Sequence, residues 1–388
     1  MSGHAGRRSR ERPRLLSSPS MDKHLALVAP HRKEHENCTF CPKLCRHSCP
    51  VSTVEGRETT TPWGKMTALH HADTGMLDLS PELAATFYAC SGCLRCTEFC
   101  DHGNRPYDAL AAGRAEALSA GVAPREAASV VEEHTRRAAK AAEHGVSLFG
   151  PTAGARVAET AFVPGCSACV TRPDDAKSAR AVVEALLGQE VRVVTAGCCG
   201  LPLHDVGDRE GFLDAARRFL ELLGRSRRVV FQDPGCMMAL AKQAPALGLA
   251  HELELVHLTE LAAAHLERFA PLGDAPAEVR YHDPCRLGRG LGVYDAPRAL
   301  LAKILGRSPE GFYHQRNLAE CSGAGAQLPR VFPETAARIA DERLRDHAMR
   351  GGGALVTACP SSAHTLSKRD PNVQVLEISS LLERSLGL

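Results

Sequence analysis

The sequence predicts an α/β C-terminal half, made of two βα repeats with mostly parallel sheets, joined to an α-rich N-terminal half. Three observations predict this division. Cysteines crowd into residues 38–49 and 90–100, and residues 108–143 are rich in the helix formers Ala, Arg and Glu. Residues 159–388 alternate short β-rich runs with helical patterns, twice over. At 388 residues the chain can form two or three domains, each with its own core.

The densest motif is Cys90-Ser-Gly-Cys93-Leu-Arg-Cys96-Thr-Glu-Phe-Cys100. Its C-x2-C-x2-C-x3-C spacing is typical of bacterial 4Fe–4S sites, because a tight loop places three thiolates around one corner of a cubane and directs the fourth to a second cluster. A structural zinc knuckle is the alternative, but such a site normally uses two C-x2-C pairs or added histidines. The run therefore predicts an iron–sulfur site.

A looser run precedes this motif, Cys38-x2-Cys41-x3-Cys45-x3-Cys49-Pro50. Two such runs predict a ferredoxin-like domain with two clusters, in which the fourth cysteine of each run binds the other cluster. The predicted ligands of 4Fe–4S cluster 1 are Cys38, Cys41, Cys45 and Cys100. The predicted ligands of 4Fe–4S cluster 2 are Cys90, Cys93, Cys96 and Cys49. The stretch 51–89 between the runs is expected to form a helical insertion beside the clusters.

Basic side chains and histidines surround these cysteines. We expect Arg46, Arg95 and Arg105 to temper the negative charge of thiolate-bound clusters rather than to bind a substrate. His47 lies between two predicted ligands, but eight cysteines already saturate two cubanes, so a solvated loop histidine is the favoured interpretation.

After this domain, residues 108–143 predict two helices separated by a turn at Gly121-Val-Ala-Pro124.

Cysteines of the C-terminal half recur at matched intervals. Cys166, Cys198 and Cys236 return as Cys285, Cys321 and Cys359, which indicates a duplicated unit. The predicted strands are 160–163, 191–195 and 228–231 in the first copy, and 278–281, 311–314 and 354–357 in the second. The predicted helices are 176–187, 211–223, 297–305 and 333–349.

Every recurring cysteine follows a predicted strand, so the cysteines of each copy are expected to converge on one rim of a parallel sheet. The candidate ligands for a cluster or metal there are Cys166, Cys198, Cys199, Cys236, Cys285, Cys321 and Cys359. An iron–sulfur cluster, zinc and reactive thiols all remain open for this rim. Buried free cysteines are disfavoured, because they would not recur at matched intervals.

Several function classes are disfavoured by the rest of the sequence. No G-x-G-x-x-G and no G-x4-G-K-[ST] motif occurs, so we expect no flavin or NAD of its own. The formal net charge of +2 argues against nucleic acid as a partner. No apolar run of membrane-spanning length occurs and no signal peptide is visible, so the expected location is the cytoplasm.

These patterns divide the chain into five segments. Composition changes and Gly/Pro punctuation set the boundaries. The segments are a disordered basic tail (1–30), the two-cluster domain with its insertion (31–118), a helical connector (119–158), the first cysteine-rich repeat (159–275) and the second (276–388).

The order of a two-cluster domain and two cysteine-rich repeats resembles a family of CCG-domain iron–sulfur subunits. It includes the heterodisulfide reductase B and C subunits, here fused, and the iron–sulfur subunits of glycolate oxidase, anaerobic glycerol-3-phosphate dehydrogenase and lactate-utilisation complexes. Beside the two N-terminal runs, the motifs that carry the resemblance are Cys198-Cys-Gly200, His282-Asp-Pro-Cys285, Cys321-Ser-Gly-Ala-Gly325 and Ala358-Cys-Pro360. The resemblance implies a flavoprotein dehydrogenase partner, and an electron acceptor such as a quinone, a disulfide or a membrane-bound carrier. It also allows peripheral association with the inner membrane through a partner.

The chain departs from the disulfide-reducing members of that family. Ser322 stands where the second repeat would have its twin cysteine. The final C-x2-C pair is broken in both repeats, as Cys236-Met-Met-Ala239 and Cys359-Pro-Ser-Ser362, while Cys169 is a possible extra ligand. The leading hypothesis is therefore an electron-transfer subunit of a flavin-dependent dehydrogenase or heterodisulfide reductase-like complex. The alternatives are a self-contained disulfide reductase that uses a cluster in the CCG repeats, and a non-redox binding module stabilised by metal.

Overall fold

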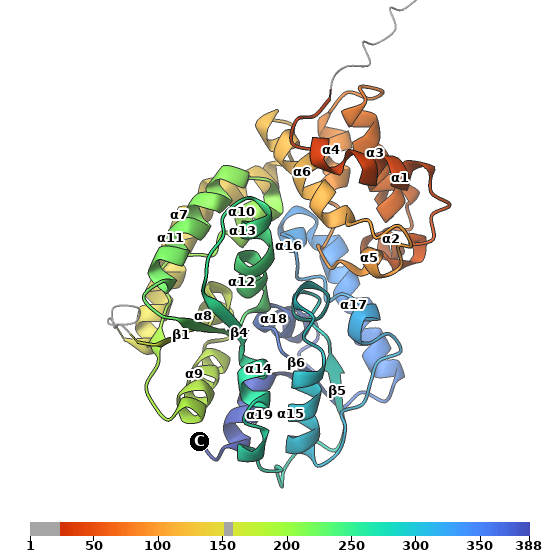
Figure 1. Cartoon of the computed structure of the whole chain (residues 1–388). Coiled ribbons are helices and arrows are strands. Elements are labelled where there is room, and N and C mark those ends of the chain that lie inside the picture. The colour runs from red at the N-terminus through yellow and green to blue at the C-terminus, as the bar shows by residue number, and fades with distance from the viewer. Residues whose placement is uncertain (1–23, 151–157) are drawn as a thin grey trace, which may run out of the picture.

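The computed structural model describes residues 24–150 and 158–388 (Figure 1). The N-terminal part is helical. Its helices within residues 32–119 sit at one end of the molecule, next to α16 (Leu328–Val331) and α17 (Pro333–Met349) of the C-terminal half, and α7 (Arg125–Phe149) runs along the first repeat (Figure 1). The helices of the N-terminal part are α1 (Arg32–Phe40), α2 (Pro50–Glu55), α3 (Pro62–Asp73), α4 (Pro81–Tyr88), α5 (Arg95–Glu98), α6 (Pro106–Ser119) and α7 (Arg125–Phe149). The expected helical insertion between the cysteine runs is α2 to α4, and the expected break at Pro124 separates α6 from α7.

The first repeat is an α/β unit with one parallel sheet. Its strand order is β2-β1-β3-β4, with Phe162 of β1 level with Val193 of β2 and Val230 of β3. The elements are β1 (Thr160–Val163), α8 (Cys166–Thr171), α9 (Pro173–Leu187), β2 (Arg192–Val193), α10 (Leu201–Val206), α11 (Arg209–Leu223), β3 (Arg228–Phe231), α12 (Pro234–Met238), the π-helix η4 (Ala239–Gln243), α13 (Ala244–Ala246), β4 (Glu254–His257) and α14 (Leu258–Ala263).

The second repeat has a smaller parallel sheet of order β5-β6-β7. Its elements are β5 (Val279–His282), the π-helix η6 (Arg286–Gly290), α15 (Asp295–Leu305), α16 (Leu328–Val331), α17 (Pro333–Met349), β6 (Ala354–Thr357), α18 (Pro360–Arg369), β7 (Val375–Glu377) and α19 (Ile378–Ser385). The predicted fold class, an α-rich N-terminal part with parallel α/β repeats after it, is thereby confirmed.

Three strand predictions for the C-terminal half need correction. Residues 311–314 form no strand; only Glu310, just before them, makes an isolated parallel bridge to Arg280. The sequence patterns also failed to predict β4 and β7, each of which lies at one edge of its sheet. Both are only three or four residues long and carry polar side chains, so their apolar pattern is weak.

One apolar core joins the two repeats. It includes Phe162 and Val182 of the first repeat together with Tyr281, Val356 and Leu381 of the second. The C-terminal helix α19 packs on α9, where the Ser178 hydroxyl donates to Glu383 at 2.5 Å. The two sheets are thus held together by burial of shared apolar surface, which is the main stabilising term in such a core.

Glu377 at the start of α19 is a buried carboxyl at the junction of the two repeats. Its side chain accepts hydrogen bonds from Ser379 N (2.9 Å) and from Gln232 Nε2 (3.3 Å), which follows β3. Burial, with Asp175 nearby, raises the pKa of Glu377 from 4.5 to about 7. Between these values the folded protein keeps a proton that the unfolded chain releases, so stability falls as pH rises through this window.

We expect Glu377→Gln to remove that fall, because the amide does not ionise. The surface variant Glu267→Gln is the control and should keep the fall. Between pH 5 and pH 8 its unfolding free energy should therefore drop by about 3 kcal/mol more than that of Glu377→Gln. Anaerobic urea titrations at the two pH values measure the difference. Parallel pH profiles for both variants would contradict the assignment.

The N-terminal part docks on the first repeat through Arg114 of α6, which is fully buried. Its guanidinium donates to the carbonyl oxygens of Phe87 (2.9 Å), Cys90 (3.1 Å) and Asp205 (2.6 Å). We expect Arg114→Met to destabilise the protein by about 3–5 kcal/mol, because three buried carbonyls lose their partners. Arg136→Met, at an exposed position of α7, is the control and should change the unfolding free energy by less than about 0.5 kcal/mol. Equal urea midpoints for the two variants would show that Arg114 does not hold this interface.

Candidate iron–sulfur sites

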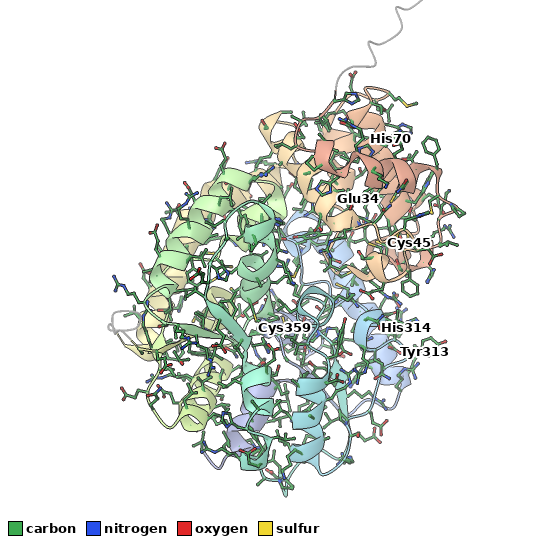
Figure 2. All side chains as sticks on the ribbon, in the orientation of Figure 1. Glu34, Cys45, His70, Tyr313, His314 and Cys359 are labelled. Carbon is green, nitrogen blue, oxygen red and sulfur yellow. The ribbon has the colours of Figure 1, made fainter. Side chains whose placement is uncertain are left out.

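The four cysteines predicted for cluster 1 lie together near the surface of the N-terminal part. Cys38 lies in the last turn of α1, and the charges of Cys45, Cys100 and Cys41 all act on its thiol. Burial and these neighbours raise the pKa of Cys38 to about 12, although Asn104 Nδ2 donates to its sulfur at 3.2 Å. Cys45, which is half-buried, lies near the outer edge of this part (Figure 2).

The four cysteines predicted for cluster 2 line one small internal cavity. Cys90, Cys93 and Cys96 reach it from the loop before α5 and from α5 itself, and Cys49 reaches it from the start of α2. The cavity has a basic group that the sequence patterns did not single out, Lys65 of α3, whose side chain is almost fully buried.

Lys65 Nζ donates to Cys49 Sγ at 3.3 Å. No carboxylate among the described residues forms an ion pair with this ammonium, and the acidic group that it contacts is the Cys49 thiol. Burial lowers the pKa of Lys65, but the nearby Cys49 and Cys90 charges outweigh burial and raise it. A buried cation of this kind is stable only beside negative charge, and this supports thiolates that hold an anionic cluster. The sequence does hold a signal for Lys65. It lies one helical turn before Leu69, on the face of α3 that is buried.

The arginines singled out from the sequence behave differently from one another. Arg95 is buried, and its guanidinium donates to Leu318 O (3.0 Å) and Ser48 O (3.4 Å) and contacts His314 Nδ1 (3.1 Å). Arg46 and Arg105 are paired near the surface with Glu58 and Asp108. Figure 2 shows His314 on the flank of the second repeat below Cys45, so Arg95 joins the cysteine loop to that repeat.

His47 is exposed and packs its ring against Phe99, with the ring centroids 4.6 Å apart. This surface position agrees with the solvated histidine that the sequence favoured.

Cysteines of both repeats meet in a single cavity of about 240 Å³. Those that line it are Cys166, Cys199, Cys236, Cys285 and Cys359. Each sits at or near the carboxyl end of a strand or at the start of the helix that follows, as the predicted topology requires. Where the sequence predicted a rim for each repeat, the structure brings the two rims together, and Cys359 lies near the centre of the molecule (Figure 2).

Cys198 lies behind the cavity wall, in contact with Cys166. Cys199 and Cys236 are also in contact, with 3.5 Å between their sulfurs. Cys169 is buried in α8 beside Cys166, and it does not line this cavity.

The thiols of this shared cavity are not reactive groups on their own. Burial raises the pKa of Cys359 to about 12, and contact with Cys198 together with burial raises the pKa of Cys166 further. Such thiols stay protonated at neutral pH, and a metal or cluster must displace their protons. The set therefore suits a cluster or metal better than nucleophilic catalysis.

The two positions where the second repeat lacks a motif cysteine are in contact with one another. Ser322 Oγ and Ser362 Oγ lie 3.0 Å apart at the edge of the same cavity. Serine oxygen is a poor substitute for thiolate sulfur at iron. The first repeat thus contributes three of the cysteines that line this cavity and the second repeat contributes two.

Cys321 does not line the shared cavity; it faces the N-terminal part. Its side chain contacts Cys93, one of the predicted cluster 2 ligands, and its sulfur lies 3.4 Å from Ser91 Oγ. Arg289 of η6 covers this junction and donates to Cys93 O at 2.6 Å. The two predicted cysteine systems thus touch at Cys93 and Cys321, which sequence spacing could not show.

Arg286 and Asp205 form a buried ion pair (2.9 Å) on the wall of the shared cavity. Asp205 also accepts a hydrogen bond from the Tyr107 hydroxyl at 2.5 Å. No pattern in the sequence singled out these three residues, because they come from three separate segments that only the tertiary fold brings together.

No helix within residues 24–150 and 158–388 is long and apolar enough to cross a membrane. No group of three or more His, Cys, Asp or Glu side chains in that part of the chain is arranged to hold a single metal ion.

Family profiles match the two halves of the chain. The profile of the 4Fe-4S dicluster domain matches residues 34–104, and that of the cysteine-rich domain CCG matches residues 160–241 and 279–367. Among solved structures, a hypothetical protein from Helicobacter pylori superposes over 94% of this chain and 76% of its own, with a TM-score of 0.55 and 11% identity. At that identity the likeness shows the fold alone.

Curated relatives match this chain over different lengths. One of the subunits of the dihydromethanophenazine:CoB–CoM heterodisulfide reductase of Methanosarcina barkeri is 26% identical, over 96% of this chain and 98% of its own. One of the subunits of the CoM/CoB fumarate reductase of Methanothermobacter marburgensis is 27% identical, over 70% of this chain and 55% of its own. Lactate utilization protein A of an Exiguobacterium species is 24% identical, over 49% of this chain and 82% of its own.

Proposed function

The chain is an iron–sulfur protein with a 4Fe-4S dicluster domain and a duplicated CCG domain, and we propose that it serves as the electron-transfer subunit of a flavin-dependent dehydrogenase or heterodisulfide reductase-like complex. In this role it relays electrons between a flavoprotein partner and an acceptor at the shared CCG cavity. The relatives named as subunits of heterodisulfide and fumarate reductases support a multi-subunit setting.

The ligand sets proposed for the two 4Fe–4S clusters are those predicted from the spacing. Cys38, Cys41, Cys45 and Cys100 would hold cluster 1, and Cys49, Cys90, Cys93 and Cys96 would hold cluster 2. When bound, each cluster supplies a centre that takes up and releases one electron. The residues around them exclude water and set the charge: Lys65 neutralises thiolate at Cys49, and Asn104 donates to the Cys38 sulfur.

The contact between Cys93 and Cys321 carries this proposal. It joins the buried cysteine set of the N-terminal part to the second repeat without an intervening residue. The set around Cys45 lies on the outer side, where a donor protein can approach. These positions support a path from the surface to Cys321, and Cys285 of the shared cavity lies close to both Cys93 and Cys321.

Anaerobic purification with iron and sulfide analysis and EPR tests this function. We expect about eight iron atoms per chain for two 4Fe–4S clusters, more if the shared cavity holds a cluster, and co-purification with a flavoprotein that reduces them. A native protein that binds no flavoprotein and neither accepts nor donates electrons would refute the role. Zinc without iron beyond the N-terminal part would favour a binding module stabilised by metal.

A second candidate function is disulfide reduction at the shared cavity. Its volume of about 240 Å³ and its cysteine lining favour this alternative. It requires the isolated chain to cleave a disulfide when given electrons, and requires Cys199→Ala to abolish that cleavage. Unchanged turnover in this variant, or no turnover with any disulfide, excludes it.

A further inference from the structure

A third cavity lies apart from both cysteine sites, between α6, α10 and η4. Its volume of about 470 Å³ is in the usual range of small-molecule sites. The electron path described above does not use it. Most of its wall is apolar, formed by Leu27, Pro30, Ala111, Ala112, Ala115 and Leu247.

The charges around this α6–η4 cavity do not balance. Arg105 and Asp108 neutralise each other in a 2.5 Å ion pair, and His31 is paired with Glu34. Two further cations line the cavity, and neither forms an ion pair with a residue in the described parts of the chain. They are Arg209, at the start of α11, and Lys242 of η4. The opening thus carries two uncompensated positive charges above an apolar wall.

The same cavity is lined by uncharged polar groups. Gln243 is only 6% exposed, and its Oε1 has no hydrogen-bond partner among the described residues. It ends the π-helix η4, a type of element found frequently at functional sites. Burial lowers the pKa of His204 to about 4, so this residue is neutral at pH 7 and adds a hydrogen-bonding group without charge.

We propose that the α6–η4 cavity binds a small organic anion with an apolar body. The anionic head lies between Arg209 and Lys242, and the body packs on the alanines of α6. The Gln243 Oε1 atom is an acceptor, and a buried acceptor without a donor costs free energy. An occupant that carries an O–H group, such as the monoanion of an alkyl phosphate, would supply that donor and recover part of the cost. Fatty carboxylates and alkyl phosphates share this chemistry.

The position of the cavity gives binding a consequence. Tyr107 lines the cluster 2 cavity, and its hydroxyl lies 3.3 Å from His204 Nδ1 on the other side. The contacting side chains of His204 and Tyr107 therefore separate the α6–η4 cavity from the cysteine site. If cluster 2 is held as proposed, added negative charge disfavours its reduction, and its midpoint potential should fall when the anion binds.

Calorimetry on the anaerobically purified full chain tests the site independently of electron transfer. The probes are octanoate, octyl phosphate, 1-octanol and inorganic phosphate. We expect saturable binding of one anionic amphiphile per chain, at least tenfold tighter than octanol or phosphate. The tighter of octanoate and octyl phosphate identifies the head group. Octanol that binds as well as octanoate, or no saturable binding of either amphiphile, overturns the proposal.

Variants locate the binding. Lys242→Gln and Arg209→Gln should each weaken binding roughly threefold, the usual effect of an exposed charge pair. Ala112→Phe should weaken binding, because its ring takes up part of the cavity beside the apolar wall. Arg218→Gln on α11, which does not line the cavity, is the matched control and should bind as the parent does.

Unchanged circular dichroism and iron content show that each variant is folded. Equal affinities for all four variants would place the anion elsewhere and overturn the site. An EPR-monitored redox titration with octanoate then tests the link to cluster 2. If octanoate binds saturably but the midpoint potential of cluster 2 does not change, the link is overturned. The binding site itself is tested by the calorimetry alone.

Discussion

Replacing Cys100 with alanine is expected to remove the cluster that begins at Cys38, although Cys100 is the last cysteine of the other run. Iron should fall from about eight to about four atoms per chain, because an incomplete ligand set does not retain a cubane. Cys49→Ala should likewise remove the cluster formed by Cys90, Cys93 and Cys96. Iron analysis and EPR of the reduced protein measure both losses.

Double variants separate crossed from uncrossed ligation. In the crossed arrangement, Cys38→Ala with Cys100→Ala loses no more iron than either single change, while Cys96→Ala with Cys100→Ala loses both clusters. The reverse pattern would assign Cys100 to the cluster of its own run. Cys169→Ala, a buried cysteine outside both sets, is the control and should keep both EPR signals.

Replacing Lys65 with methionine is expected to lower the midpoint potential of cluster 2 by on the order of 100 mV. The ammonium lies 3.3 Å from Cys49 Sγ in a buried site, where a unit charge is weakly screened and favours the more negative, reduced state. An EPR-monitored redox titration measures the potential of each cluster.

The matched control is Lys43→Met. Lys43 lies over the Trp63 ring, 3.7 Å from its centroid, near the surface and next to the other cysteine set. Solvent screening should keep its effect well below that of Lys65. Lys65→Arg retains the charge and should restore most of the potential. A cluster 2 potential that is the same in Lys65→Met and in the parent would show that the ammonium is only a packing element.

The proposal for the anion site and the proposal for the electron path are tested by separate experiments, so one can be wrong while the other holds. Calorimetry on the α6–η4 cavity needs only folded protein, whereas the role in electron transfer depends on iron content and on a flavoprotein partner. The absence of binding would leave the cysteine path intact, and loss of the iron sites would leave the cavity to be tested by itself.

Local chemistry and fold class could be predicted from the order of residues alone. Cysteine spacing predicted the two N-terminal sets, because ligands a few residues apart are constrained by the backbone. The repeat of Cys166, Cys198 and Cys236 as Cys285, Cys321 and Cys359 predicted a duplicated unit, and alternating strands and helices predicted parallel sheets. Short, polar edge strands were missed, since their pattern is too weak to detect.

The way in which these parts meet depends on the folded chain. The two repeats share one core and one cavity, Cys321 turns away from that cavity to contact Cys93, and Lys65 reaches Cys49 from a separate helix. Such contacts join residues that are far apart in the chain. The spacing of residues in the sequence restricts only the geometry of near neighbours. How distant segments pack is decided by the burial of apolar surface and by the pairing of buried charges.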